Sequence, residues 1–151
     1  MADIKTPEAR SLNMSKIRSR DTKPEVWLRK QLFSRGYRYR KNASHIPGHP
    51  DLWMTKYNTA IFVHGCFWHR HQGCKYAYHP KSRTEFWEDK FRRNMDRDRE
   101  VEAELAASGI RMLIIWECTI KIMMKSDERR EAVLSVIEQF LNSDEDHLII
   151  E

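Results

Sequence analysis

Apolar positions recur with helical spacing in three segments of the chain. The first follows the capping box Thr22-Lys23-Pro24-Glu25, places Trp27 and Leu32 on one face, and ends at Gly36. The longest covers residues 85–108 and ends at Gly109, and the third covers residues 127–141. The chain is therefore expected to contain three amphipathic helices separated by other structure.

Shorter apolar runs between these helices predict strands. Residues 37–41 read as a basic edge strand, and residues 51–55 and 59–64 read as a hairpin that turns at Tyr57-Asn58. Residues 111–116 (RMLIIW) are nearly all apolar, as in a strand covered on both faces, whereas residues 65–83 read as an ordered loop. The order of elements predicts an α/β fold with a central mixed β-sheet flanked by helices.

Composition narrows the class of protein. The 151 residues are enough for one domain, and 40% of them are hydrophobic, which argues against disorder. No run of 18 apolar residues and no signal peptide is visible, so the sequence predicts a cytoplasmic protein with no membrane contact. Without secretion, its three cysteines are expected to be reduced or metal-bound.

Charge is unevenly distributed along the chain. Residues 1–50 carry +8, residues 51–100 carry +3 and residues 101–151 carry −6, for a net charge of +5. Such a basic first half suits a polyanion, most simply nucleic acid, although it also suits a solvated basic surface. Residues 1–20 are predicted to be a basic arm that becomes ordered on DNA, and residues 21–151 to be a single domain.

The helix predicted over residues 85–108 carries two polar residues on its apolar stripe. Asn94 and Asp98 lie between Phe91 and Val101 at helical spacing. A buried carboxylate is unfavourable unless it is hydrogen-bonded, paired or metal-linked. Asp98 is therefore either a satisfied core residue, or on a face turned to solvent, or a carboxylate directed at a site.

Other candidate groups converge on one end of the predicted hairpin. Asp51 opens one strand and His64 closes its antiparallel neighbour, so both should lie at the same end of the sheet, with His69 and Glu25 as further candidates. A carboxylate beside a neighbouring carbonyl suits Mg²⁺, and a neutral histidine can deprotonate water near pH 7. Taken singly, each histidine could equally be structural or on the surface.

A second cluster combines soft ligands. Cys66, His71 and Cys74 lie within nine residues, and Cys118 follows a predicted central strand. Four such ligands describe a structural zinc site, although three buried reduced cysteines are the alternative. Zinc would hold Phe67 and Trp68 in an exposed pose for stacking on or between bases; otherwise both rings pack under the loop.

The run His64-Gly-Cys66-Phe-Trp-His69 resembles the very short patch repair (Vsr) mismatch endonucleases. The resemblance extends to about Cys118 and includes Pro47-Gly-His-Pro50-Asp51, Thr84-Glu-Phe-Trp87, Asn94-x3-Asp98 and Ile115-Trp-Glu-Cys118. It implies a restriction-endonuclease-like fold and an enzyme that uses catalytic Mg²⁺ and structural Zn²⁺. Such an enzyme nicks duplex DNA 5′ of the T in a T:G mismatch, which arises when 5-methylcytosine deaminates, and so initiates very short patch repair.

The resemblance also assigns roles to residues of this chain. Asp51 would bind magnesium beside the backbone carbonyl of Val63, His69 would be the base, and His64 would stabilise the scissile phosphate. Glu25 and Asp98 would hold metal-bound waters and orient His69. The zinc ligands would be Cys66, His71, Cys74 and Cys118. The residues entering or facing the mismatch would be Met14, Phe67, Trp68, Trp87, Lys90 and Asn94.

Two other functions remain open from the sequence. One is a restriction-type endonuclease that cuts both strands, and the other is a non-catalytic zinc-containing module that binds duplex DNA. The carboxylates Glu25, Asp51 and Asp98 count against a pure binder, because acids repel phosphate unless a metal intervenes. We expect a bacterial, nucleoid-associated monomer, with mismatch-repair proteins as candidate partners.

Overall fold

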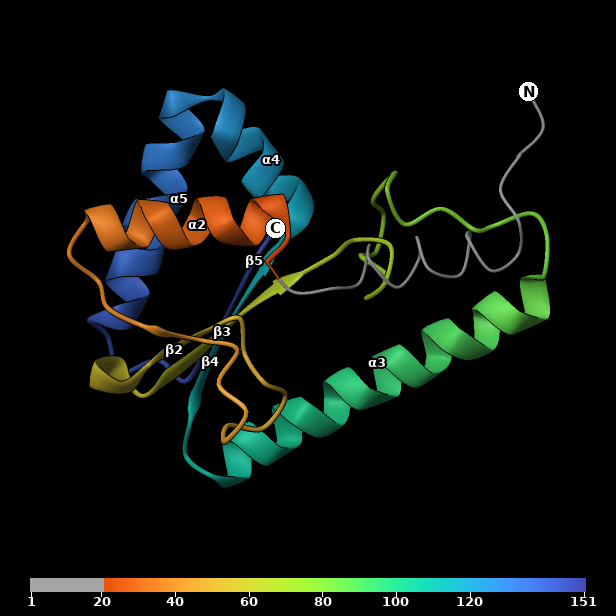
Figure 1. Ribbon diagram of the computed structural model, residues 1–151, viewed down its shortest axis with the longest axis horizontal. Coiled ribbons are helices and arrows are strands. Elements are labelled where there is room, and N and C mark those ends of the chain that lie inside the picture. The colour runs from red at the N-terminus through yellow and green to blue at the C-terminus, as the bar shows by residue number, and fades with distance from the viewer. Residues whose placement is uncertain (1–20) are drawn as a thin grey trace.

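Five strands form a mixed sheet at the centre of the computed structural model, which describes residues 21–151 (Figure 1). The strands lie in chain order and are β1 (Arg40–Lys41), β2 (Leu52–Met54), β3 (Thr59–His64), β4 (Arg111–Trp116) and β5 (His147–Ile150). Strands β1, β2 and β3 are antiparallel neighbours, whereas β4 is parallel to both β3 and β5. The predicted α/β fold with a central mixed sheet is confirmed.

Four α-helices accompany the sheet in this part of the chain: α2 (Lys23–Ser34), α3 (Thr84–Ala107), α4 (Glu117–Lys125) and α5 (Asp127–Leu141). The predicted cap is present, since Thr22 Oγ1 accepts a hydrogen bond from the Glu25 N–H at the start of α2. Three of the helices match the predicted ones within two residues. No helix among residues 21–151 is long and apolar enough to cross a membrane.

The predicted strand boundaries need correction at the first two strands. The edge strand covers only Arg40–Lys41 rather than residues 37–41, because Tyr37 packs into the core beside α5 instead of pairing. The next strand ends at Met54 because a 3-10 turn, Thr55–Tyr57, follows it, and Asn58 then adopts a left-handed conformation. The hairpin itself is confirmed as antiparallel.

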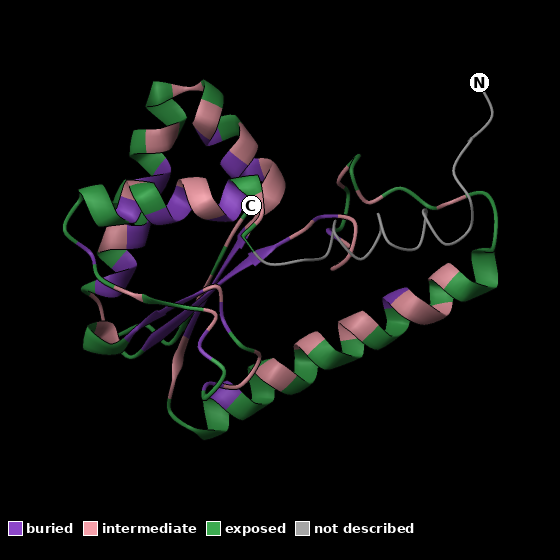
Figure 2. Cartoon of the chain, viewed as in Figure 1, coloured by how far each residue is buried: buried purple, intermediate pink, exposed green. Residues whose placement is uncertain are grey.

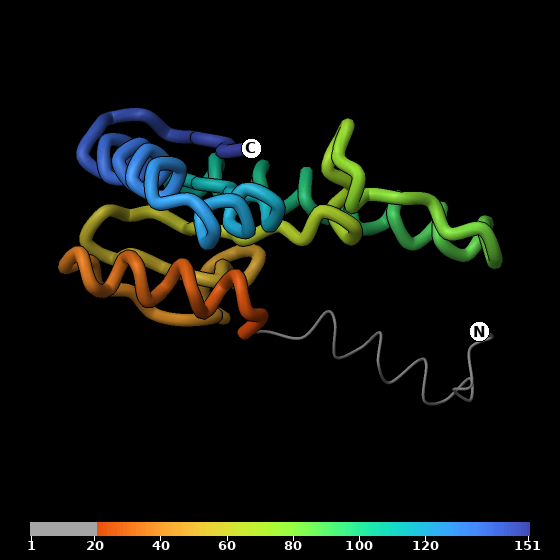
Figure 3. Tube along the Cα trace, turned by 90° about the horizontal axis from the view of Figure 1, so that it is seen from above, coloured from red at the N-terminus to blue at the C-terminus, as the bar shows by residue number. Residues whose placement is uncertain are grey.

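Different helices cover the two faces of the sheet (Figures 1 and 3). Along β3, Ile61 and Val63 belong to the core formed with α2, α4 and α5, whereas Ala60 and Phe62 belong to the core on the α3 side. Strand β4 alternates in the same way, which explains its nearly continuous apolar run. The sheet end that holds the candidate residues is therefore enclosed between α2 and α3.

Helix α3 extends beyond the sheet, and most of its surface is exposed to solvent (Figure 2). Only Phe91 and Leu105 are buried on it, and Asn94, Asp98 and Val101 are partly buried along the same face. The predicted stripe is thus the face turned toward the rest of the molecule. Asn94 and Asp98 lie where that stripe passes the end of the sheet.

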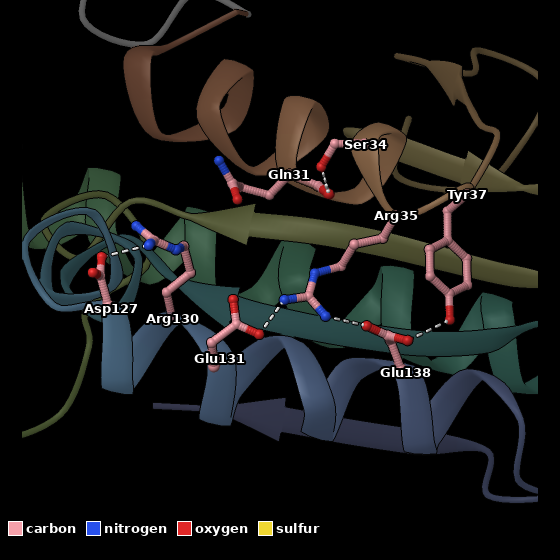
Figure 4. Close-up of polar contacts among 8 residues, drawn as sticks. All are labelled: Gln31, Ser34, Arg35, Tyr37, Asp127, Arg130, Glu131 and Glu138. Carbon is pink, nitrogen blue, oxygen red and sulfur yellow. Dashed lines mark hydrogen bonds and ion pairs between the residues drawn. The ribbon is translucent and has the colours of Figure 1, made fainter.

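The C-terminal end of α2 is attached to α5 by charged groups (Figure 4). Arg35 lies between Glu131 and Glu138, with 2.7 Å from its Nη1 to Glu138 Oε1, and these carboxylates raise its pKa. The Tyr37 hydroxyl donates to Glu138 at 3.3 Å. These contacts fix the direction of α2 and so the place of its first turn, which carries Glu25.

Candidate active site and metal centre

A cavity of about 380 Å³ lies where β2 begins and β3 ends. Gly48 forms part of its wall at a φ of +80°, and a side chain there would come within 2.5 Å of Val101 Cγ1 on α3. The sequence-predicted residues that line the cavity are Glu25, Asp51, Val63, His64, Trp68, His69, Asn94 and Asp98. The structure therefore brings together residues that lie up to 73 positions apart in the sequence.

Two carboxyl groups meet on the α2 side of this cavity. Asp51 stands directly before β2 and its Oδ2 accepts the Val63 N–H at 2.6 Å, while Glu25 lies in the first turn of α2. The two carboxyls lie close enough to interact electrostatically. Burial, together with the charge of Glu25, raises the pKa of Asp51 to about 7, and burial raises that of Glu25.

The electrostatics of this pair fit a divalent cation. Arg29 is buried and reaches Glu25 Oε2 at 3.2 Å and Asp21 Oδ1 at 2.5 Å, so it offsets only part of the negative charge. Carboxylate oxygens at a buried, acidic position suit a hard ion such as Mg²⁺. Asp51 and the carbonyl of Val63 are the groups available to hold such an ion beside Glu25.

The α3 side of the cavity carries a histidine held by a carboxylate. His69 lies in the loop after β3, and its Nδ1 is 2.7 Å from Asp98 Oδ2. An ionised carboxylate only accepts hydrogen bonds, so Nδ1 is the donor, and in the neutral imidazole Nε2 then carries the lone pair. This arrangement prepares His69 to accept a proton, and it explains why a carboxylate lies on the apolar stripe of α3.

His64 is stacked on His69. Their ring centroids are 3.9 Å apart with an interplanar angle of 5°, and the edge of Trp116 closes the other side at 5.2 Å. Burial, and secondarily the charge of His69, holds the pKa of His64 well below its usual range. His64 is therefore neutral and can donate one hydrogen bond from its ring N–H.

The aromatic pair after Cys66 is less exposed than the sequence suggested. Phe67 is half-buried in a cluster of rings, with centroids 4.9–5.4 Å from those of Trp68, Tyr78, Trp87 and Phe91. Arg70 covers the Phe91 ring at 3.8 Å and donates to the Phe67 carbonyl at 3.1 Å. Both rings therefore pack against neighbours, and Trp68 is the one that also borders the cavity.

The remaining predicted DNA-facing residues are placed differently from one another. Asn94 lines the cavity, and its Nδ2 donates to the Trp68 carbonyl at 3.2 Å, which joins α3 to the loop that carries Phe67 and Trp68. Trp87 belongs to the ring cluster, and Lys90 lies one turn before Asn94 outside the cavity lining. Met14 and the predicted basic arm lie outside the described residues.

A cluster of cysteine and histidine side chains that could hold a metal ion lies next to the candidate active-site cavity. Cys66, His71, Cys74 and Cys118 each direct one ligand atom into a space where these atoms lie within 4.8 Å of one another. The parallel register of β3 and β4 pairs His64 with Trp116, so Cys66 and Cys118, two residues further on, leave the sheet side by side. His71 Nδ1 is 3.4 Å from Cys118 Sγ.

This donor set fits a tetrahedral zinc ion. Usual Zn–S and Zn–N bond lengths place neighbouring sulfur and nitrogen ligands about 3.6 Å apart, close to the distance between Cys118 and His71. Burial raises the pKa of the Cys66 thiol to about 12, so the thiolate needs a cation for its stabilisation. Cys66, Cys74 and Cys118 are free thiols, and residues 21–151 contain no disulfide.

Sequence reasoning missed four polar residues that line the candidate active-site cavity. They are Thr22, His49, Arg97 and Glu117. Arg97 directly precedes Asp98, and Glu117 directly precedes Cys118 at the end of β4. The sequence could have indicated these two residues only by their position next to a candidate site residue. Glu117 is paired with Lys121 at 3.2 Å, one helical turn along α4.

Comparison with known proteins assigns the chain to a family. The family model described as DNA mismatch endonuclease Vsr matches residues 2–75. Type II nicking enzyme V.NmeAIP of Neisseria meningitidis is 47% identical over 121 residues, covering 80% of this chain and 86% of that protein. DNA mismatch endonuclease Vsr of Escherichia coli is 38% identical over 141 residues, covering 93% and 88% respectively.

A third relative agrees. Type II nicking enzyme V.XorIIP of Xanthomonas oryzae is 40% identical over 134 residues, covering 89% of this chain and 98% of that protein. Identity at this level over most of both chains is accompanied here by a cavity that holds a carboxylate pair and a carboxylate-bound histidine. The chain therefore belongs to the Vsr family of DNA mismatch endonucleases and is a DNA endonuclease.

Proposed function

We propose that this chain is a Mg²⁺-dependent endonuclease that nicks one strand of duplex DNA 5′ of the T in a T:G mismatch and so initiates very short patch repair. The observation that carries the proposal is the pairing of His69 with Asp98 opposite the carboxyls of Glu25 and Asp51 in one cavity. A base and a hard-cation site facing each other are what metal-assisted phosphodiester hydrolysis requires.

In the proposed reaction His69 is the general base. Asp98 keeps the proton on Nδ1, so Nε2 accepts the proton of the water that attacks phosphorus. As that proton arrives, the carboxylate of Asp98 stabilises the positive charge on the ring. Asp98 thus acts through His69, and both belong to the catalytic set with Glu25 and Asp51.

The carboxyl pair would position the metal and the attacking water. Asp51 and the Val63 carbonyl would hold Mg²⁺, which when bound supplies a Lewis acid for the phosphate oxygens and a template for the attack. Glu25, beside Asp51, would accept hydrogen bonds from metal-bound waters at that position. The N–H of Val63 keeps the Asp51 carboxylate oriented at the end of β3.

His64 is placed to stabilise the scissile phosphate. It is neutral because burial lowers its pKa, and its ring is fixed between His69 and Trp116. A fixed N–H donor directed at a phosphate oxygen favours the transition state, in which negative charge accumulates on that oxygen.

Mismatch selection is assigned to the aromatic residues and the face of α3 beside the cavity. Trp68 borders the cavity, Phe67 supports it, and Asn94 ties its backbone to α3. Unstacking is easier at a mismatch than at a normal pair, so a ring inserted there favours T:G over matched DNA. Trp87, Lys90 and Met14 are proposed to complete this surface, and the basic residues 1–20 are proposed to become ordered on the duplex.

Other parts of the proposal follow from the metal centre and the family. Zn²⁺ held by Cys66, His71, Cys74 and Cys118 would attach the loop to the start of α4. We also propose that residues 21–151 form one endonuclease domain with a restriction-endonuclease-like fold. The enzyme is proposed to be a monomer that acts in the bacterial cytoplasm at the nucleoid, with mismatch-repair proteins as partners. The relatives V.NmeAIP and V.XorIIP are named as type II nicking enzymes, which favours one cut strand over two.

The metal part of the proposal is tested by varying the ion and the ligand together. Wild-type protein and the Asp51→Asn variant are incubated with a T:G duplex in Mg²⁺ and in a chelator, while binding of the same duplex is followed by fluorescence anisotropy. Nicking is expected only for wild type in Mg²⁺, with both proteins binding DNA. Nicking by wild type in the chelator would exclude a metal-dependent reaction.

A further inference from the structure

His71 has a partner on each ring nitrogen. Its Nδ1 is 3.4 Å from Cys118 Sγ in the metal cluster, and its Nε2 is 2.7 Å from Glu151 Oε2. The ring is buried and stacked flat on Trp116, with centroids 4.2 Å apart and an angle of 8° between the planes. The imidazole therefore has one orientation, and a carboxylate stands on the side away from the sulfur ligands.

The chemistry of the pair decides which nitrogen can bind metal. A carboxylate accepts hydrogen bonds, so Glu151 places the proton of a neutral His71 on Nε2 and leaves the Nδ1 lone pair directed at the cysteines. A negative partner also makes the imidazole a stronger electron donor. The opposite tautomer would present an N–H to the metal and could not ligate it.

The fold brings Glu151 to this position through the register of the last strand. Strand β5 runs parallel to β4 with Ile150 opposite Ile115, so the residue after β5 comes level with Trp116. Cys118 lies two residues beyond Trp116, in the first turn of α4. The edge strand of the sheet thereby ends against the metal cluster, although 80 residues separate Glu151 from His71.

We propose that Glu151 is a positioning residue for the zinc centre, which orients His71 and couples the edge strand β5 to metal binding. The inference rests on the proposed zinc site and adds to it a group that none of the four ligands supplies. Loss of such a partner typically lowers metal affinity about 10–100-fold. The Glu151 side chain is 60% exposed, so we expect the lower end, about 10-fold.

The test measures zinc retention and does not depend on nicking. Wild type, Glu151→Gln and Glu151→Ala are purified with zinc, and the metal content, the zinc affinity and the rate of release to a chromophoric chelator are determined. Glu145→Ala is the matched control, because Glu145 is an exposed glutamate in the segment that leads into β5. Thermal unfolding of each zinc-loaded protein shows whether the fold is retained.

We expect Glu151→Ala to bind zinc about 10-fold more weakly and to release it faster, with Glu151→Gln in between because an amide oxygen still accepts the Nε2 proton without the charge. The control should match wild type. A wild type that holds zinc together with Glu151 variants that retain it equally well overturns the role of Glu151 alone. A folded wild type without zinc overturns the zinc site as well.

Discussion

The aromatic residues after Cys66 allow a test in which stability and mismatch recognition separate. The Trp68 ring packs against the rings of Phe67 and Trp87, with centroid distances of 5.0 Å and 5.8 Å, and it borders the cavity. Phe67 instead lies inside the ring cluster, against Trp68, Tyr78, Trp87 and Phe91. We predict that Phe67→Ala mainly destabilises the loop, whereas Trp68→Ala mainly weakens T:G recognition.

The magnitudes follow from these contacts. An aromatic pair contributes about 0.5–1.5 kcal/mol beyond its buried area, so the loss of two ring contacts in Trp68→Ala should by itself lower the free energy of unfolding by about 1–3 kcal/mol, before the lost burial is counted. By the same measure, removing Phe67 should lower it by about 2–6 kcal/mol, a large part of the stability of a small domain. Stacking on one base is worth about 1–3 kcal/mol, which for Trp68→Ala means binding of a T:G duplex weaker by roughly ten-fold or more.

The assay combines urea unfolding with DNA binding. Unfolding is followed by circular dichroism, and anisotropy of labelled T:G and C:G duplexes is measured without Mg²⁺ so that no strand is nicked. Phe33→Ala on α2 is the control, because Phe33 is an exposed aromatic that is 52% accessible and lies outside the cavity lining. Equal destabilisation by both loop variants, with an unchanged ratio of T:G to C:G affinity, would refute the assignment of Trp68 to mismatch recognition.

Three further changes test the chemistry and the zinc centre. Asp51→Asn should abolish nicking in Mg²⁺ while DNA binding stays near wild type, because a ligand of the hard ion is lost; near-normal nicking would exclude Asp51 as that ligand. His69→Ala should lower the single-turnover rate by about 10²–10⁴-fold and flatten the acidic limb of the pH–rate profile, and an unchanged profile would assign the base elsewhere. Cys118→Ser should reduce zinc content and lower the melting temperature, since ligation contributes to folding; a variant with full zinc and wild-type melting would remove Cys118 from the site.

The site residues that the sequence located are those fixed by local geometry. An antiparallel hairpin necessarily brings the start of one strand beside the end of the next, which placed Asp51 near His64. Helical spacing likewise placed Asp98 on the inner face of α3, and the structure supplies its partner, His69. Neither inference needed the order of the strands.

The parts that the sequence did not locate depend on contacts between distant segments. Helix α4 follows β4 without a turn residue between Trp116 and Glu117, so no local signal separated the two elements. Strand β5 is short and exposed on alternate residues, and only its pairing with β4 identifies it. The contact of Glu151 with His71 depends on that pairing and therefore had no sequence signal.

The burial of Phe67 illustrates the same limit. Two adjacent aromatics between metal ligands suggested exposed rings, but residues from α3 and from the loop near Tyr78 enclose Phe67. Arg70 adds to this enclosure by donating to the carbonyls of Phe67, Ala77 and Tyr78. Packing between a loop and a helix is set by three-dimensional arrangement, which residue spacing alone does not encode.

The most direct test of the proposed activity is to map the cut on matched duplexes. Wild-type protein is incubated in Mg²⁺ with duplexes that carry T:G, T:A or C:G at one position, with each strand labelled in turn, and the products are sized at single-nucleotide resolution. We predict a single nick, 5′ of the T and in the T:G duplex alone, that disappears when Mg²⁺ is chelated. Cutting of both strands, or equal cutting of the three duplexes, would contradict a mismatch-specific nicking enzyme.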